Sequence, residues 1–226
     1  MTAVRLDRVM TGFRCEARQL GRVTAKLSDR EWERPTGCVP WSVADLFAHV
    51  SAAVGRLPAM LAEEPPPRAE VSAADYYRPD ARFSPEVDAV RISSARQHAG
   101  GPALVGVFAA VRTQVDRLCA PESDTRVVRT RHGDPMLLSA FMLTRVVELA
   151  VHGLDLAAAL GRAPWTTPEA ASLVEELLLG PEPRADFGEL GWDRPTFLAK
   201  ATGRLPIGAE EALRVERLGV TWLTLG

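Results

Sequence analysis

The sequence predicts a mainly α-helical protein organised as a helical bundle. Apolar residues recur at three- and four-residue steps in several long segments, which is the pattern of amphipathic helices. Prolines and glycines separate these segments, and capping residues begin several of them. With 226 residues, 46% hydrophobic and 25% charged, the chain can bury a substantial core. We therefore expect one main bundle over residues 1–165 and a small C-terminal extension over residues 166–226.

The first three helices follow one another with one long interruption. The first covers residues 6–27, and the second begins at Ser42, where Ser42 and Asp45 form a capping box. Residues 63–85 contain three consecutive prolines and no helical period, so a long loop is expected there. The third helix begins at Pro102, because proline favours the first position of a helix.

The longest helix comes next and ends the bundle. Residues 126–131 are expected to form a short extended piece, followed by a turn in which Asp134 serves as the N-cap of this helix. The helix then runs to Leu160, and Gly161 suits its C-terminal end. Two shorter helices are predicted after it, over residues 168–179 and 209–217.

Charge and cysteine content exclude several classes of partner. The net charge is −2 and the isoelectric point is near 6.1, so no positive field attracts nucleic acid or anionic lipid. Three widely spaced cysteines form neither a disulfide framework nor a zinc ribbon. No window of about 18 apolar residues and no signal-peptide pattern is present. We expect a cytoplasmic monomer or homodimer without a nucleic-acid or membrane partner.

The longest predicted helix carries a row of polar side chains on an otherwise apolar surface. At about 100° per residue, its charged and imidazole groups share a stripe about 80° wide. They are Arg145, Glu148, His152 and Asp155. A lone buried carboxylate or imidazole costs several kcal/mol. This row must therefore be paired or coordinated inside the protein.

Two interpretations of the row remain open. One is a ladder of ion pairs, since Arg145 precedes Glu148 by three residues, the spacing of helix neighbours. The other is a metal site, because Glu148 and His152 at positions i and i+4 direct their ligand atoms to one point. His49 on the second helix completes a set of two histidines and one glutamate. That set leaves one coordination position open, as catalytic zinc sites do.

Other candidate residues carry weaker signals. His98 and His132 lie in segments expected to face solvent, and Cys38 is better explained as a small buried residue than as a ligand. The sequence has no G-x-S-x-G elbow, P-loop or dinucleotide fingerprint. The sequence therefore contains none of the motifs that usually indicate a serine hydrolase, a nucleotide hydrolase or a dehydrogenase.

Two segments carry a family resemblance. Residues 35–49 read PTGCVPWSVADLFAH, and residues 145–155 read RVVELAVHGLD. In order and spacing they resemble the mycothiol-dependent maleylpyruvate isomerase family of the DinB-like superfamily. The resemblance implies a four-helix bundle that binds a divalent metal, often zinc, through the residues matched here as His49, Glu148 and His152. It also implies mycothiol as a thiol cofactor or co-substrate.

The resemblance extends less fully to the C-terminal extension. Family members often carry a small C-terminal α/β domain with a Gly-Arg pair, which Gly203 and Arg204 resemble. By this match Arg204 corresponds to an arginine that assists catalysis, and the extension is helical or α/β. Because the extension is short, a surface position without a catalytic role is an equally supported interpretation of Arg204.

The expected function follows from the metal and the thiol. A bound metal would favour thiolate over thiol, and the thiolate would attack a small electrophilic substrate, giving isomerisation or S-transfer. Arg145 and Asp155 are expected to orient Glu148 and His152. Two alternatives remain: a hydrolase that uses metal-activated water, and a non-catalytic protein that binds a metal or small molecule.

Overall fold

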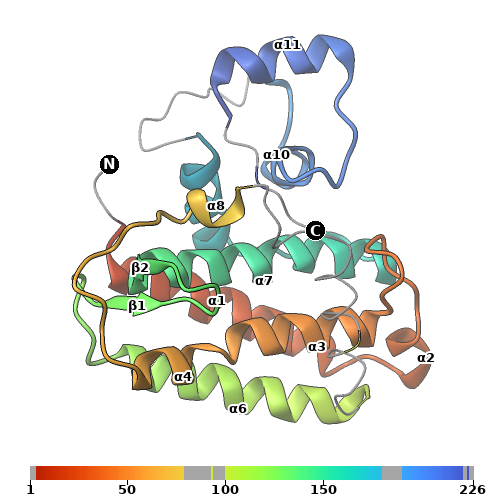
Figure 1. Ribbon diagram of the computed structural model, residues 1–226. Coiled ribbons are helices and arrows are strands. Elements are labelled where there is room, and N and C mark those ends of the chain that lie inside the picture. The colour runs from red at the N-terminus through yellow and green to blue at the C-terminus, as the bar shows by residue number, and fades with distance from the viewer. Residues whose placement is uncertain (1–3, 79–92, 94–99, 180–189, 221–222, 224–226) are drawn as a thin grey trace.

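Long helices lie side by side and enclose the core of the protein (Figure 1). The structure is a computed structural model that describes residues 4–78, 93, 100–179, 190–220 and 223. Among these residues, α7 packs against α1 and α3, and α6 packs against the same two helices. This closed arrangement is a four-helix bundle, as predicted. Its members are α1 (Leu6–Thr24), α3 (Val43–Val54), α6 (Pro102–Cys119) and α7 (Leu138–Leu160).

Shorter elements join and extend the bundle. They are α2 (Asp29–Trp32), α4 (Leu57–Ala62), the 3-10 helix η1 (Asp75–Tyr77), β1 (Val127–Arg129), β2 (Pro135–Leu137), α8 (Pro168–Leu179), α10 (Arg194–Ala201) and α11 (Ala209–Leu218). The sequence did not predict α2, α4, η1 or α10. Each of these is a single turn or a few turns long, too short for a helical period to stand out.

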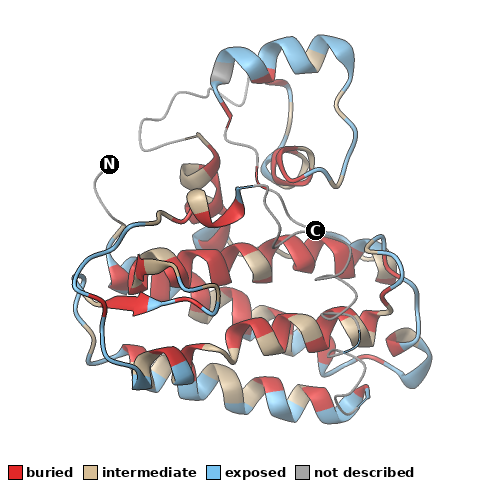
Figure 2. Cartoon of the chain, in the orientation of Figure 1, coloured by how far each residue is buried: buried red, intermediate tan, exposed pale blue. Residues whose placement is uncertain are grey.

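The central position of α7 explains its composition. Nearly every residue from Leu138 to Leu160 is buried, and Gly161 ends the helix in the left-handed conformation, with φ 65°. Figure 2 shows buried residues all along this helix, whereas the outer face of α6 and most of α11 are exposed. The sequence predicted both the burial and the glycine end of α7.

The start predicted for α7 was wrong. Asp134 is not its N-cap, because residues 135–137 form strand β2, which pairs antiparallel with β1. The helix begins only at Leu138, whose N–H donates to Arg126 O over 2.8 Å. Pro135 fits a strand of a two-stranded sheet, where a missing donor is tolerated, and its carbonyl accepts from Glu70 N at 2.9 Å.

The predicted loop over residues 63–85 is described as far as residue 78, and its second half contains the 3-10 helix η1. Ser72 and Asp75 cap that turn through two hydrogen bonds of 2.8 and 3.2 Å. Tyr76 and Tyr77 on the turn are buried, and Tyr77 Oη donates to Thr144 O on α7 at 2.9 Å. The loop therefore covers part of α7.

The C-terminal extension begins by packing on the bundle. Helix α8 contacts α1 and α7, and α10 contacts α8 and α7. The described residues of the extension form α8, α10 and α11 and contain no strand. The division at residue 165 into two domains stays a prediction. Within the part of the chain that is described, no helix is both long and apolar enough to cross a membrane.

Gly12 on α1 packs closely against α8. A Cβ added to Gly12 would lie 2.5 Å from Leu173 Cδ1 and 3.5 Å from Glu169 O. We expect Gly12→Leu to lower the free energy of unfolding by about 1–3 kcal/mol, because the extra atoms must displace α8. Urea denaturation measures the change.

Gly21 provides a matched control on the same helix. A Cβ at Gly21 would meet nothing within 4 Å among the described residues. Gly21→Leu should leave stability unchanged or raise it by up to about 1 kcal/mol, through helix propensity alone. Equal destabilisation by both variants would contradict close packing at Gly12.

The buried carboxylate of Glu16 on α1 accepts hydrogen bonds from the residue that precedes α8. Glu16 is fully buried, and its Oε2 accepts from Thr167 N at 2.8 Å and from Thr167 Oγ1 at 2.7 Å. Its Oε1 has no hydrogen-bond partner among the described residues, nor does the nearby Trp165 Nε1. A Cβ added to Gly153 on α7 would lie within 4 Å of both atoms. Glu16 therefore sits where α1, α7 and the connection to α8 meet.

This burial predicts a pH-dependent stability. Burial raises the pKa of Glu16 above its ordinary value of 4.5, so the folded protein holds this proton more tightly than the unfolded chain. Its stabilising contribution is present below pH 4.5 and is lost as pH rises through the folded-state pKa. In urea titrations at several pH values, Glu16→Gln should gain stability relative to wild type as pH rises. A stability difference between Glu16→Gln and wild type that stays constant with pH would contradict the prediction.

Candidate metal centre

His49 reaches the centre from α3 because the start of that helix is tightly capped. Ser42 Oγ accepts from Asp45 N at 3.1 Å, and Asp45 Oδ2 accepts from Ser42 N at 3.0 Å, which confirms the predicted capping box. Trp41, buried just before the cap, packs its ring 4.6 Å from the His49 ring. Helix start and aromatic contact together orient the imidazole toward α7.

The three predicted metal ligands lie together between α3 and α7. Glu148 Oε2 is 3.6 Å from His49 Nε2 and 3.3 Å from His152 Nε2. The two imidazole rings stand nearly perpendicular, with centroids 5.4 Å apart. Their side chains are only 9–16% exposed. Glu148 thus joins two histidines from different helices at one point.

The spacing and chemistry of these donors fit a divalent metal ion. One ligand atom from each residue lies within 4.8 Å of the others. Tetrahedral zinc with bonds of about 2.0–2.1 Å separates its ligand atoms by roughly 3.4 Å, close to the two distances to Glu148. Two imidazoles and one carboxylate form the ligand set of catalytic zinc sites that keep an open position.

The charges of the site also favour a cation. Burial would raise the pKa of Glu148, yet hydrogen bonds with His152 and His49 and the charge of Arg145 hold it well below its usual range. Burial would lower the pKa of His152, yet contacts with Asp155, Cys38 and Glu148 raise it well above its usual value. For His49, burial prevails and lowers the pKa. The carboxylates therefore stabilise positive charge at His152, and a metal ion would compete with its proton.

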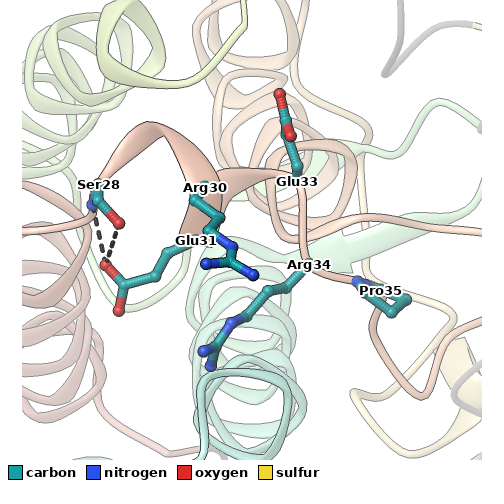
Figure 3. Close-up of a pocket in the computed structure, with 6 residues that line it drawn as sticks. All are labelled: Ser28, Arg30, Glu31, Glu33, Arg34 and Pro35. Atoms are coloured by element: carbon teal, nitrogen blue, oxygen red, sulfur yellow. Dashed lines mark hydrogen bonds between the residues drawn. The ribbon is translucent and has the colours of Figure 1, made fainter.

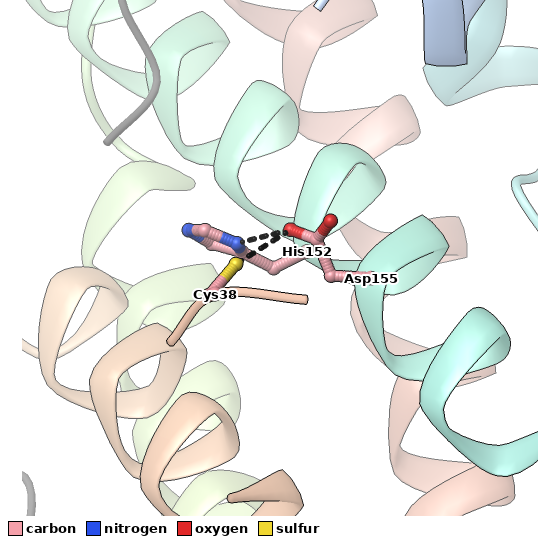
Figure 4. A group of neighbouring side chains, drawn as sticks. All are labelled: Cys38, His152 and Asp155. Atoms are coloured by element: carbon pink, nitrogen blue, oxygen red, sulfur yellow. Dashed lines mark hydrogen bonds and ion pairs between the residues drawn. The ribbon is translucent and has the colours of Figure 1, made fainter. Parts of the chain in front are cut away.

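The other nitrogen of His152 faces a second polar group (Figure 4). His152 Nδ1 is 2.9 Å from Asp155 Oδ2, and the Cys38 thiol lies 3.4 Å from the same oxygen. Arg204 donates to both oxygens of this carboxylate, through Nε and Nη2, each at 3.1 Å. Hydrogen bonds with His152 and Arg204 outweigh burial and hold the pKa of Asp155 at about 2. An ionised Asp155 can only accept, so Nδ1 of His152 donates.

Cys38, His152 and Asp155 also lie close enough to share an ion. The Arg204 guanidinium already neutralises Asp155, so a second cation there would meet an occupied carboxylate. The set formed by His49, Glu148 and His152 is the better metal site. Sequence reasoning placed Cys38 as a small buried residue and missed its contact with Asp155, because the turn that carries it has no helical period.

Arg145 lies beside Glu148, and neighbours on α3 and α7 hold its guanidinium. Its guanidinium donates to Thr144 Oγ1 at 3.0 and 3.1 Å and to Ala53 O at 3.2 Å, and it stacks 4.7 Å from the Phe141 ring centroid. Its ion pair with Glu148 is long, at 3.9 Å. Arg145 therefore supplies positive charge near Glu148, and its role in orienting that side chain stays a prediction.

Two other candidates lie elsewhere. His132 is in the turn between β1 and β2, and His98 falls outside the described residues. A pocket at α2 is lined by charged residues (Figure 3), but none of them is a predicted site residue. There Glu31 completes the cap with Ser28 and pairs with Arg162 at 2.6 Å. Hydrogen bonds with Ser28 and Arg162 hold the pKa of Glu31 at about 2. Glu31 is therefore ionised, and its charge is balanced by Arg162.

Comparisons with known proteins agree with the fold. Two solved structures are similar: crystal structures of the mycothiol-dependent maleylpyruvate isomerase and of a histidine-to-alanine mutant of it. Each is 17% identical to the chain, with a TM-score of 0.52, and the match covers 77% of this chain and 70% of the other. At this identity the likeness concerns the fold alone. No curated protein matches the sequence.

The family assignment rests on the bundle itself. The model of the mycothiol maleylpyruvate isomerase N-terminal domain matches residues 13–157, which is more than half of the chain. That range includes His49, Glu148 and His152 and stops before the extension that carries Arg204. The chain therefore belongs to the mycothiol maleylpyruvate isomerase N-terminal domain family.

Proposed function

We propose that this protein is a metal-dependent enzyme in which a low-molecular-weight thiol, mycothiol, attacks a small electrophilic substrate, giving isomerisation or S-transfer. One observation carries the proposal: His49, Glu148 and His152 converge from two helices on one point and leave room in the ligand set for a further group. The family supports a thiol as that group. A cytoplasmic location and a monomeric or homodimeric state remain predictions.

His49, Glu148 and His152 would hold the ion, with zinc as the first choice. When bound, a divalent ion stabilises the thiolate form of a thiol at neutral pH. Asp155 accepts a hydrogen bond from Nδ1–H of His152, so Nε2, which lies beside Glu148, is the nitrogen that would bind the ion in place of its proton. The three donor side chains are only 9–16% exposed, so little of their surface contacts bulk water.

Arg204 is proposed as the arginine that assists the reaction. It reaches the site from the C-terminal extension and holds both oxygens of Asp155, while its Nη1 donates to Thr202 O at 2.7 Å. The guanidinium therefore fixes the carboxylate that orients His152. The Arg204 side chain is 14% exposed, so part of it contacts solvent.

Metal content tests the ligand set. We expect about one ion per chain in wild type by elemental analysis after dialysis, and little in His49→Ala or His152→Ala, because two remaining ligands bind weakly. His132→Ala, outside the centre, should retain the ion. Circular dichroism checks that each variant is folded. Equal metal in wild type and the two ligand variants would contradict the site.

Thiol consumption tests the reaction. Zinc-loaded protein is incubated with mycothiol and a panel of electrophiles, and products are followed by mass spectrometry. We expect product formation that requires both the thiol and the ion, and that falls at least about tenfold in Asp155→Asn, because orienting partners of ligands typically contribute 10–100-fold. Turnover with water alone would indicate a hydrolase instead. Full metal occupancy without any chemistry would indicate a binding protein.

A further inference from the structure

The turn before α3 brings a thiol to the edge of the candidate centre. Cys38 on this turn is half-buried, whereas the adjacent Val39 is exposed. The Sγ atom of Cys38 lies 3.4 Å from Asp155 Oδ2 on α7, and Figure 4 shows the thiol beside the imidazole of His152. The Cys38 side chain therefore points from an exposed turn toward α7.

Hydrogen bonds within the turn hold Cys38 in this place. Trp41 N donates to Cys38 O at 2.8 Å, and Cys38 N donates to Thr36 Oγ1 at 3.2 Å. The Thr36 hydroxyl donates to Trp41 O at 2.9 Å, and both Thr36 and Trp41 are buried. The Trp41 ring also packs 4.6 Å from the His49 ring. One turn thus contacts His49 through Trp41 and the Asp155–His152 pair through Cys38.

Three groups donate hydrogen bonds to the Asp155 carboxylate. Arg204 donates to both of its oxygens, and His152 Nδ1 donates to Oδ2 at 2.9 Å. Because ionised Asp155 can only accept, the thiol of Cys38 is the donor in the third contact. A thiol is a weak donor, but a charged acceptor strengthens the hydrogen bond. Arg204 comes from the extension and Cys38 from the bundle, so two parts of the chain hold this carboxylate.

We propose that Cys38 is a positioning residue of the metal centre: its thiol fixes the Asp155 carboxylate, which in turn orients His152 toward the ion. This inference rests on the metal centre of the proposed function and adds a residue to it. Groups that orient a ligand from behind contribute to metal affinity, because they fix the tautomer and the direction of the ring. The sulfur of Cys38 lies on the Nδ1 side of His152, so it acts without binding the ion at Nε2.

Zinc affinity, measured by competition with a chromophoric chelator, tests this role without any turnover. We expect Cys38→Ala to bind zinc about three- to tenfold more weakly than wild type, because it removes one donor to Asp155 and leaves all three ligands in place. Cys38→Ser keeps a donor and should bind zinc more tightly than Cys38→Ala. Cys15 is also half-buried but lies on α1, so Cys15→Ala is the matched control and should bind as wild type does. Circular dichroism checks that each variant is folded.

A double-mutant cycle shows whether Cys38 acts through Asp155. In an Asp155→Asn background, the further change Cys38→Ala should alter zinc affinity by less than about twofold, because the charged acceptor held by the thiol is already gone. Cobalt-loaded wild type provides a spectroscopic check. It should lack a sulfur-to-metal charge-transfer band, because the sulfur is not a ligand.

Several results would overturn this role. They are unchanged zinc affinity in Cys38→Ala, a Cys38→Ser variant that binds no better than Cys38→Ala, an equal loss of affinity in the Asp155→Asn background, and a charge-transfer band that disappears in Cys38→Ala, which would make Cys38 a ligand. Wild type that binds no zinc would reject the metal centre, and with it both this role and the proposed function. Zinc affinity that depends on Cys38 in a protein that fails to consume thiol would uphold the role and reject the proposed function.

Discussion

The buried carboxylate of Glu148 is the constraint on which the site depends. An ionised carboxylate on the inner face of α7 is too costly to leave without partners, and its partners come from three directions: His49 on α3, His152 one turn along α7, and Arg145 one turn before it. The packing of α3 on α7 is therefore also an electrostatic arrangement. Any loosening of these two helices would separate the donors that converge on Glu148.

The proximity of the candidate ligands could be predicted because it depends largely on local spacing along α7. Positions i and i+4 bring Glu148 and His152 together on any helix, whatever the rest of the fold does. His49 needed one further assumption, that its helix packs against the longest helix, and the family resemblance supplied it. A helical bundle was predictable from the long amphipathic segments, which have few ways to bury their apolar faces, whereas the four-helix arrangement was implied by the family resemblance.

What the sequence did not reveal depends on contacts between distant segments. The strand at residues 135–137 exists because residues 127–129 lie beside it, and pairing of that kind overrides the local preference of Asp134 and Pro135 for a helix start. The turn with Tyr76 and Tyr77 does carry a local signal, the S-x-x-D spacing of Ser72 and Asp75, which is short and easily overlooked.

The two ring nitrogens of His152 contact groups that are held by two different parts of the chain. Nε2 meets Glu148 within the bundle, whereas Nδ1 meets Asp155, which is held by Arg204 from the extension. The family match includes His152, Glu148 and Asp155 and ends before the extension that carries Arg204. A change in the segment that reaches Asp155 would therefore alter the surroundings of Nδ1 and leave in place the two helices that carry His49, Glu148 and His152.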